Sequence, residues 1–343
     1  MVTNYNNALQ ESDNHKYDSS HCFLCGVKLI PSNKTKEHVI PKWLLKQYDL
    51  YDQNYILYNG STIRYRHLTI PCCKKCNSKY LKSLEDKVKE FHDGGFEKFA
   101  SIDKETLFYW LGKIYYGLIY RDLSLKNKLS DPNSDTIIDK QFIKQFESHH
   151  IFLQGIRKRH RFNGFVPWSI FIVNTQQPSD ISEQWDLMDN SIVYNNRVDE
   201  SKITMFISLR MGDIGLVCAL QDGGSLEQLK DIFSNFFSIV LHPIQLREFA
   251  AMACYKSTLF NRTPKYMSIS GNDGMTETTQ MPLAGLSTKP LFDNGNPADC
   301  AIFLSEYLQL PLDIVNPKED LLYTFMKTKD GQTNFMDVNK LQP

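Results

Sequence analysis

The sequence predicts an α+β protein made of a small N-terminal metal-binding module and a larger mixed α+β region of unrecognised fold. Five of the eight cysteines lie between residues 21 and 92, in a stretch that also carries short β-like runs and one amphipathic helical pattern. Helical and strand patterns alternate again after residue 100. We therefore expect a polar segment over residues 1–20, the module over residues 21–100 and the larger region over residues 101–343.

Charge separates the module from the rest of the chain. The whole chain has 39 Lys+Arg and 39 Asp+Glu, whereas residues 21–92 contain 13 basic and 6 acidic side chains. The module is therefore basic and the remainder is acidic. A basic module favours a polyanionic partner, and nucleic acid is the common one.

The composition also excludes several classes of protein. Residues 1–20 are polar, and no apolar run approaches the roughly 20 residues that span a bilayer. We therefore expect a cytoplasmic protein without a membrane span. A chain this long with eight cysteines is not a small disulfide scaffold, so Cys218 and Cys254 are expected to be reduced, buried thiols.

Two CxxC pairs, Cys22–Cys25 and Cys73–Cys76, predict a structural zinc site. The two intervening residues form a tight turn that directs both thiolates at one ion, and two such turns complete a tetrahedral site. Four thiolates leave no position for a reactive water molecule. Cys72 competes with Cys73 as a ligand; the shorter Cys73–Cys76 loop favours that pair, and Cys72 stays an alternative.

Between and after the pairs, the pattern predicts a short strand and then a helix. Glu37-His38 begins a β-like run that Pro41 ends. Asn77 stands at the head of the helical pattern, and Gly94-Gly95 stop it. The apolar stripe of this helix is Leu81, Leu84, Val88 and Phe91.

This order of pieces resembles the zinc-knuckle branch of the HNH endonuclease family, which has a ββα-metal fold. The matching pieces are Cys22–Cys25, Glu37-His38-Val39-Ile40-Pro41 and Cys73–Cys76-Asn77. The resemblance covers residues 21–95 and none of the rest. It implies a metal-dependent endonuclease that hydrolyses phosphodiester bonds, with double-stranded DNA favoured as the partner.

The resemblance also implies a role for three side chains. His38 matches the general base that activates water, and Glu37 and Asn77 match ligands of a catalytic divalent ion. A neutral imidazole accepts a proton from water near pH 7. Carboxylate and amide oxygens suit Mg²⁺ or Mn²⁺, which is separate from the structural zinc.

The chain departs from the family pattern at three places. The acidic residue is Glu37 instead of the usual Asp. The middle residue of the motif has no clean match, so His67, by its offset, and Asn59, the nearest upstream Asn, are both weak candidates. Leu81 stands where many members have a further metal ligand. Glu85 lies eight residues past Asn77, a rise of about 12 Å, and is a weak candidate too.

We call the pair Cys22–Cys25 the first knuckle and the pair Cys73–Cys76 the second knuckle. Four lysines gather at the second knuckle and the start of the following helix: Lys74, Lys75, Lys79 and Lys82. Their place beside the expected catalytic ion predicts phosphate contacts. A solvated basic helix face explains the same cluster, so both interpretations stay open.

Beyond residue 100 we expect alternating helices and strands without a second catalytic motif. The expected elements are helices over 106–125 and 139–159 (the latter ending in the basic run 157–161), a buried strand over 168–173, strands over 202–209 and 214–220 that form a hairpin, helices opened by a capping box at Ser225 and by His242-Pro243, and a loop-rich stretch over 271–297.

The larger region carries no recognised chemistry, so its role is predicted by analogy. Residues 101–343 are expected to recognise a target, sense a ligand or regulatory protein, or mediate homo-oligomer assembly. Defence against foreign DNA, such as that of a phage, fits this arrangement. The alternative is a zinc-dependent nucleic-acid-binding or assembly protein that does not cleave, with a sensing C-terminal domain.

Overall fold

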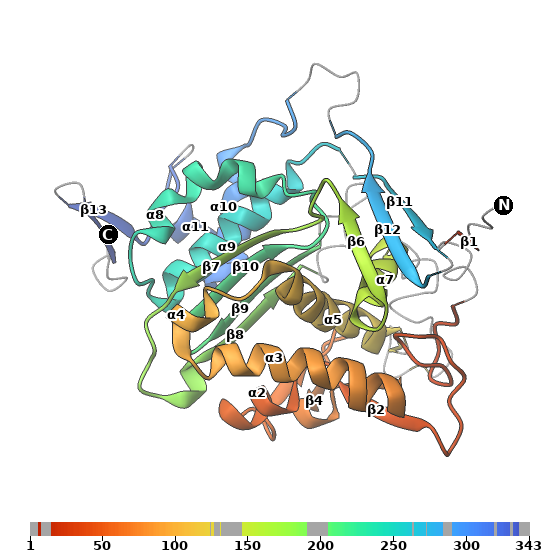
Figure 1. Cartoon of the computed structure of the whole chain (residues 1–343). Coiled ribbons are helices and arrows are strands. Elements are labelled where there is room, and N and C mark those ends of the chain that lie inside the picture. The colour runs from red at the N-terminus through yellow and green to blue at the C-terminus, as the bar shows by residue number, and fades with distance from the viewer. Residues whose placement is uncertain are drawn as a thin grey trace. The chain divides into compact units, whose positions relative to one another are not determined.

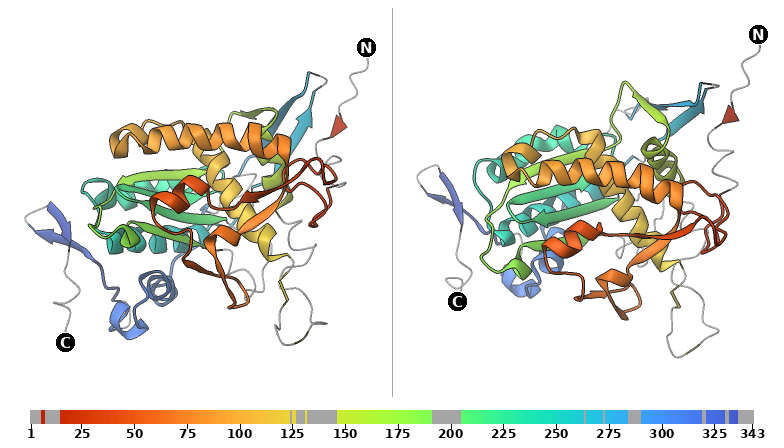
Figure 2. Two further views of the ribbon diagram at one scale, coloured as in Figure 1. Left: turned by 90° about the horizontal axis from the view of Figure 1, so that it is seen from below. Right: turned by 60° about the horizontal axis from the view of Figure 1, so that its bottom comes forward.

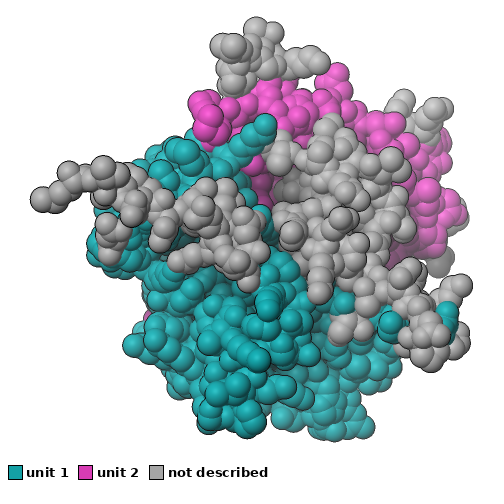
Figure 3. Space-filling model, turned by 90° about the vertical axis from the view of Figure 1, so that its right-hand side faces the viewer, with its two compact units in different colours: residues 1–94, 101–165, 265–280 teal, residues 95–100, 166–264, 281–343 magenta. Residues whose placement is uncertain are grey.

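A computed structural model gives the fold, which is mixed α+β as expected (Figure 1). It describes residues 6–7, 15–123, 125–126, 131, 146–190, 205–262, 264–271, 273–283, 290–318, 321–329 and 332–335. The chain divides into two units, coloured in Figure 3. Unit 1 comprises residues 1–94, 101–165 and 265–280, and unit 2 comprises residues 95–100, 166–264 and 281–343.

Unit 1 contains both predicted knuckles. Its helices are α2 (Lys42–Gln47), α3 (Lys82–His92), α5 (Lys104–Asp122) and α7 (Glu147–Leu153), and a π-helical turn, Cys76–Leu81, precedes α3. Its strands are β1 (Asn6–Asn7), β2 (Lys34–His38), β3 (Asn54–Ile56), β4 (Thr62–Arg64), β5 (Thr69–Cys73), β6 (Arg159–Asn163), β11 (Tyr266–Ser270) and β12 (Met275–Gln280). The predicted strand at Glu37-His38 and the helix ending before Gly94 are both present.

The hairpin of β2 and β5 positions the candidate site. The two strands pair antiparallel, with Glu37 opposite Ile70 and His38 opposite Thr69. Successive side chains of a strand point to opposite faces, so Glu37 and His38 face opposite sides of this hairpin. Figure 2 shows α3, in orange, in two further views. Of the predicted apolar stripe, Leu81 just before α3 and Val88 are buried, and Leu84 and Phe91 are partly buried.

Helix α5 belongs to unit 1 and not to a separate domain that starts after residue 100. Asp103 caps its first turn by accepting a hydrogen bond from the Thr106 N–H at 2.8 Å. The helix approaches the hairpin closely at Gly117, where a Cβ atom would lie 3.1 Å from a methyl group of Val39. Unit 1 therefore adds residues 101–165 and 265–280 to residues 21–94 of the predicted module, and residues 95–100 belong to unit 2.

A second sheet of unit 1 combines distant segments in the order β1-β11-β12-β6. Strand β6 pairs parallel with β12, with His160 opposite Thr276. The basic run 157–161 therefore does not end the predicted helix but leads into β6. The side chains of β6 alternate between exposed and partly buried, as in a strand with one covered face. Residues 139–145 of the predicted helix lie outside the described residues. The predicted loop 271–297 contains β12.

Unit 2 is built on an antiparallel sheet in the order β7-β10-β9-β8. Its strands are β7 (Ser169–Asn174), β8 (Trp185–Asp189), β9 (Phe206–Met211) and β10 (Ile214–Ala219), with the small sheet β13 (Met326–Lys329) and β14 (Gln332–Phe335). Its helices are α4 (Gly95–Phe99), α8 (Ser234–Phe237), α9 (Pro243–Thr258), α10 (Pro297–Leu308) and α11 (Leu312–Val315). Phe171 of β7 and Phe249 of α9 belong to one buried apolar core.

Two local predictions in unit 2 have different outcomes. The β9–β10 hairpin is confirmed, although residues 202–204 lie outside the described part of the chain. His242 caps α9 with Gln245 in a capping box. The predicted box at Ser225 is wrong, because buried Asp222 accepts the Leu226 N–H at 2.8 Å in its place and a 3₁₀ segment follows. Across the described residues, no helix is long and apolar enough to cross a bilayer.

Candidate functional site

Four cysteines of unit 1 form a cluster that can hold a metal ion such as zinc. The Sγ atoms of Cys22, Cys25, Cys73 and Cys76 all lie within 4.8 Å of one another. The Cys25 and Cys73 sulfurs are 3.8 Å apart. Tetrahedral zinc with Zn–S bonds of about 2.3 Å requires nearly this sulfur–sulfur spacing. The donor set and its spacing therefore fit the zinc site expected from the two CxxC pairs.

The backbone prepares both knuckles for a metal. The Cys76 N–H donates to the Cys73 sulfur at 3.4 Å, and the Phe23 N–H donates to the carbonyl of Pro71 at 2.9 Å. Hydrogen bonds, first from Cys25 and then from Cys72, lower the pKa of the Cys22 thiol, and the hydrogen bond with Cys22 raises the pKa of Cys25 to about 11 and that of Cys76. The thiols therefore share protons, and a metal ion would have to displace those protons. Cys72 lies 3.9 Å from Cys22, sulfur to sulfur, but is not one of the four clustered cysteines.

Helix α7 supports the first knuckle from outside the stretch that resembles the HNH family. His150 Nε2 lies 3.1 Å from the carbonyl of Phe23, and Gln154 donates to the carbonyl of Leu24 at 2.9 Å. Burial lowers the pKa of His150 well below 6.5, so the ring is neutral and donates one hydrogen bond. Contacts to the turn between two ligands fix the direction of those ligands.

Glu37 is buried in an ion-pair cluster with Lys113 of α5. The Lys113 Nζ atom lies 2.6 Å from Glu37 Oε1 and 3.0 Å from Glu85 Oε1. It also donates to the backbone carbonyls of His38, at 2.8 Å, and Val39, at 3.3 Å. The side chain of Lys113 is 1% exposed, so these four oxygens replace water around its ammonium group.

The charges of this cluster are strongly coupled. Burial raises the pKa of Glu37 to about 7, and the neighbouring Lys113 ammonium opposes that rise. Burial alone would lower the pKa of Lys113, but Glu37 and then Glu85 outweigh it and raise the pKa. We conclude that Lys113 is charged at neutral pH, because two carboxylates and two carbonyls surround it.

The residues that the HNH resemblance assigns to a catalytic divalent ion do not fit that role in this arrangement. Glu37 already binds the Lys113 ammonium, and the Asn77 amide donates to the carbonyl of Lys36 at 3.0 Å. Among the described residues, the four-cysteine cluster is the one group of three or more His, Cys, Asp or Glu side chains close enough to share a metal. Glu85, the weak candidate for the same ion, shares the Lys113 ammonium with Glu37 and is not paired with Asn77.

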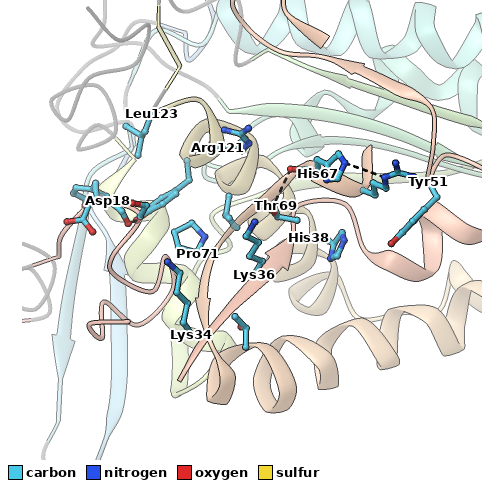
Figure 4. Close-up of a pocket in the computed structure, with 16 residues that line it drawn as sticks. Asp18, Lys34, Lys36, His38, Tyr51, His67, Thr69, Pro71, Arg121 and Leu123 are labelled. Carbon is cyan, nitrogen blue, oxygen red and sulfur yellow. Dashed lines mark hydrogen bonds between the residues drawn. The ribbon is translucent and has the colours of Figure 1, made fainter. Parts of the chain in front are cut away.

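His38 lines a pocket of about 860 Å³ on the other face of β2 (Figure 4). The basic side chains of the pocket are Lys34, Lys36, Arg66 and Arg121, and Tyr51 and Tyr120 are among its aromatic side chains. Asp52, outside the pocket, pairs with Arg66. None of the ion pairs found among the described residues involves Lys34, Lys36 or Arg121, so their charge is available to an anion.

His38 is neutral at pH 7. Burial, followed by the positive charges of Lys42 and Lys113, lowers its pKa below 6.5. Glu85 and a hydrogen bond with the backbone of Arg66 act in the opposite direction. A neutral imidazole beside a basic pocket has the protonation state that a general base needs.

The lysines predicted to contact phosphate do not line the pocket. Lys75 and Lys79 lie 6.0 and 5.4 Å from the ring centre of Tyr80, and Lys82 pairs with Asp86 at 2.6 Å. Lys74 is exposed at the second knuckle. The cations that line the pocket with His38 are instead Lys34, Lys36 and Arg66 of the hairpin region and Arg121 of α5.

The two candidates for the middle motif residue separate clearly. His67 lines the same pocket as His38, and Arg66 Nε lies 3.3 Å from His67 Nε2. Asn59 instead stabilises the β3–β4 turn by accepting the Ser61 N–H at 3.1 Å. His67 is therefore the candidate that the fold brings to His38.

We compared the chain with protein families, curated proteins and solved structures. The chain matches no protein-family model, no curated protein and no solved structure.

Proposed function

We propose that this protein hydrolyses phosphodiester bonds of nucleic acid, DNA in particular, in the pocket around His38. The single observation that carries the proposal is a pocket of about 860 Å³ that His38 lines together with Lys34, Lys36 and Arg121. Basic side chains in a concave site favour a phosphate backbone, and tyrosines offer faces on which bases stack. Defence against foreign DNA is one setting for such an activity.

In the proposed reaction, His38 removes a proton from a water molecule as that water attacks phosphorus. The bond between phosphorus and the ester oxygen then breaks, and the departing oxygen takes a proton from solvent. The cationic side chains stabilise the negative charge that grows on the phosphate oxygens. The four-cysteine site, filled with zinc, would hold β5 and the start of α3 in register beside this pocket.

Cleavage of plasmid DNA by the full chain tests the proposal, with Mg²⁺, with Mn²⁺ and with neither ion added. General-base catalysis contributes about 10²–10⁴-fold, so His38→Asn is expected to lose that factor while keeping its zinc content and thermal unfolding. His67→Ala is expected to reduce cleavage more than Asn59→Ala, which serves as the matched control outside the pocket. Equal cleavage by wild type and His38→Asn would refute the proposal.

A second function is favoured by the Glu37–Lys113 ion pair. Because Glu37 is engaged there, a zinc-dependent protein that binds nucleic acid without cutting it is the main alternative. It predicts binding that depends on Lys36 and Arg121 and no cleavage under any of the three ion conditions. The plasmid assay separates the two functions directly.

A further inference from the structure

We propose that the ammonium group of Lys113 is the resident cation of the Glu37–Glu85 carboxylate pair, on the face of the β2–β5 hairpin opposite the His38 side chain. It lies beside Glu37, one of the two ligands that the resemblance gives to a divalent ion, with Glu85 in place of Asn77 as the second partner, and it positions His38 through the backbone of β2. The part of this inference that concerns His38 rests on the proposed function, whereas the part that concerns the cation does not.

The oxygens around Lys113 are those that a hard divalent ion selects. Two carboxylates and two backbone carbonyls lie 2.6 to 3.3 Å from Nζ. Ca²⁺ takes the same oxygen types at about 2.3–2.6 Å, so a slight contraction of this shell would suit an ion. The lysine thus supplies by a covalent tether the positive charge that a bound ion would otherwise supply.

The position of α5 makes this lysine a built feature of unit 1. Gly117 lies one helical turn after Lys113, and a Cβ atom there would lie 3.1 Å from Val39 and 3.4 Å from Ile70, so the glycine allows a closer approach than most side chains would. Lys113 therefore extends from a helix whose distance to the hairpin is fixed by close packing. Tyr120 and Arg121, another turn along, line the His38 pocket.

Lys113 reaches His38 through the main chain. Its hydrogen bonds to the carbonyls of His38 and Val39 hold the end of β2, where the His38 side chain leaves the strand for the pocket. Lys113 does not itself line the pocket, so it is a positioning residue and not a catalytic one. Its loss should lower kcat and leave KM nearly unchanged.

Binding of Mn²⁺ to the zinc-loaded full chain, followed by the electron paramagnetic resonance signal of free Mn²⁺, tests the cation role. Wild type and Glu37→Gln are expected to give the same titration, because Glu37 is not open to an ion. Lys113→Ala is expected to gain one Mn²⁺ site per chain, and Lys113→Ala/Glu37→Gln is expected to lose it. Lys104→Ala, which removes an exposed lysine from the same helix, should match wild type.

Two results would overturn the proposal. One is a wild-type Mn²⁺ site that Glu37→Gln abolishes; the other is a folded Lys113→Ala variant that gains no site. If Lys113→Ala does not fold, as judged by zinc content and circular dichroism, the comparison of wild type with Glu37→Gln still decides. A wild type that fails to cleave DNA would refute the proposed function but leave these titrations unaffected.

Discussion

Unit 1 contains two polar centres, and each joins distant segments of the chain through a positive charge held among negatively charged or electron-rich side chains. The four-cysteine cluster joins the first knuckle to the second, and its thiolates need an ion from outside the chain. The Glu37–Lys113–Glu85 cluster joins β2 and α3 to α5 with a cation that the chain supplies itself. One centre therefore depends on metal supply, and the other depends only on folding.

The difference teaches why only one of the two centres can be lost by chelation. Zinc binding energy is added to folding energy, because the unfolded chain does not hold four thiolates together. A buried ion pair contributes less, because desolvation of both charges offsets much of their attraction. The large loss of stability comes when one partner is removed and the other charge stays buried without a counterion.

The largest expected effect follows from removing a zinc ligand. Cys76→Ser should reduce the zinc content from one ion per chain to none and destabilise unit 1 severely, because structural zinc contributes about 10–16 kcal/mol in zinc-finger peptides near pH 7. Elemental analysis and thermal unfolding measure both effects.

Cys72→Ser is the matched control for this prediction, since Cys72 is a buried thiol beside the cluster but not among its four members. It should retain one zinc ion per chain. Loss of zinc from Cys72→Ser and retention by Cys73→Ser would exchange the roles of these two neighbours.

The next largest effect is expected at the metal-free centre. Lys113→Met leaves the buried carboxylate of Glu37 and the partly buried one of Glu85 without their cation, and breaking a buried pair costs about 3–5 kcal/mol. The Lys113 ammonium opposes the rise in the pKa of Glu37, so its removal raises that pKa further above the ordinary 4.5. An acid whose folded pKa is raised binds more protons when folded, and the folded pKa of Glu37 is about 7 with Lys113 and higher without it. The stability deficit of Lys113→Met relative to wild type should therefore grow as the pH rises above about 7.

Urea unfolding, monitored through hydrogen exchange of the α5 amides, measures the stability that Lys113→Met loses within unit 1. Adding Glu37→Gln to Lys113→Met removes one of the stranded charges and should restore part of the stability at pH 8 but little at pH 5. A deficit that is independent of pH would indicate lost packing of the lysine stem and not stranded charge.

The two centres also differ in how far the sequence predicts them. The cysteine spacing is local, so the knuckles, β2 and the helix after Asn77 follow from short motifs. Lys113 meets Glu37 across 76 positions, and no spacing rule connects them. The one available signal was a single lysine inside the apolar run Trp110-Leu111-Gly112-Lys113-Ile114-Tyr115, which indicates a buried charge that needs a partner.

The sequence does not indicate the pocket, for a related physical reason. A count of nearby charges selects Lys74, Lys75, Lys79 and Lys82, but side-chain direction decides which cations share a cavity. Lys34, Lys36 and His38 alternate along β2 and therefore point to one face. Arg121 joins them from α5, whose packing on the hairpin depends on Gly117 and could not be read from the module alone.

A smaller effect is expected when one pocket cation is removed. In a His38→Asn background that prevents cleavage, Arg121→Ala should weaken DNA binding about tenfold, because a charge-assisted hydrogen bond is worth roughly 1.5–3 kcal/mol. The slope of log affinity against log salt should also become shallower by about one.

Lys75→Ala is the control for this measurement, because Lys75 lies near the Tyr80 ring and not in the pocket. It should change DNA affinity little. An equal loss of affinity in Lys75→Ala and Arg121→Ala would extend the nucleic-acid surface to the second knuckle, as the sequence first predicts.

The smallest expected effect is a shift in the pH profile of cleavage, and it links the metal-free centre to the pocket. His38 must be neutral to act as a base, and its pKa is lowered by burial, then by Lys42 and Lys113. The rate should therefore be nearly constant above pH 6.5 and fall only at lower pH. Lys113→Met removes one cause of the lowering, so the acid limb should move up toward 6.5, whereas Lys104→Ala should not move it. Equal profiles in wild type and Lys113→Met would mean that the Glu37–Lys113–Glu85 cluster does not affect the protonation of His38 in the pocket.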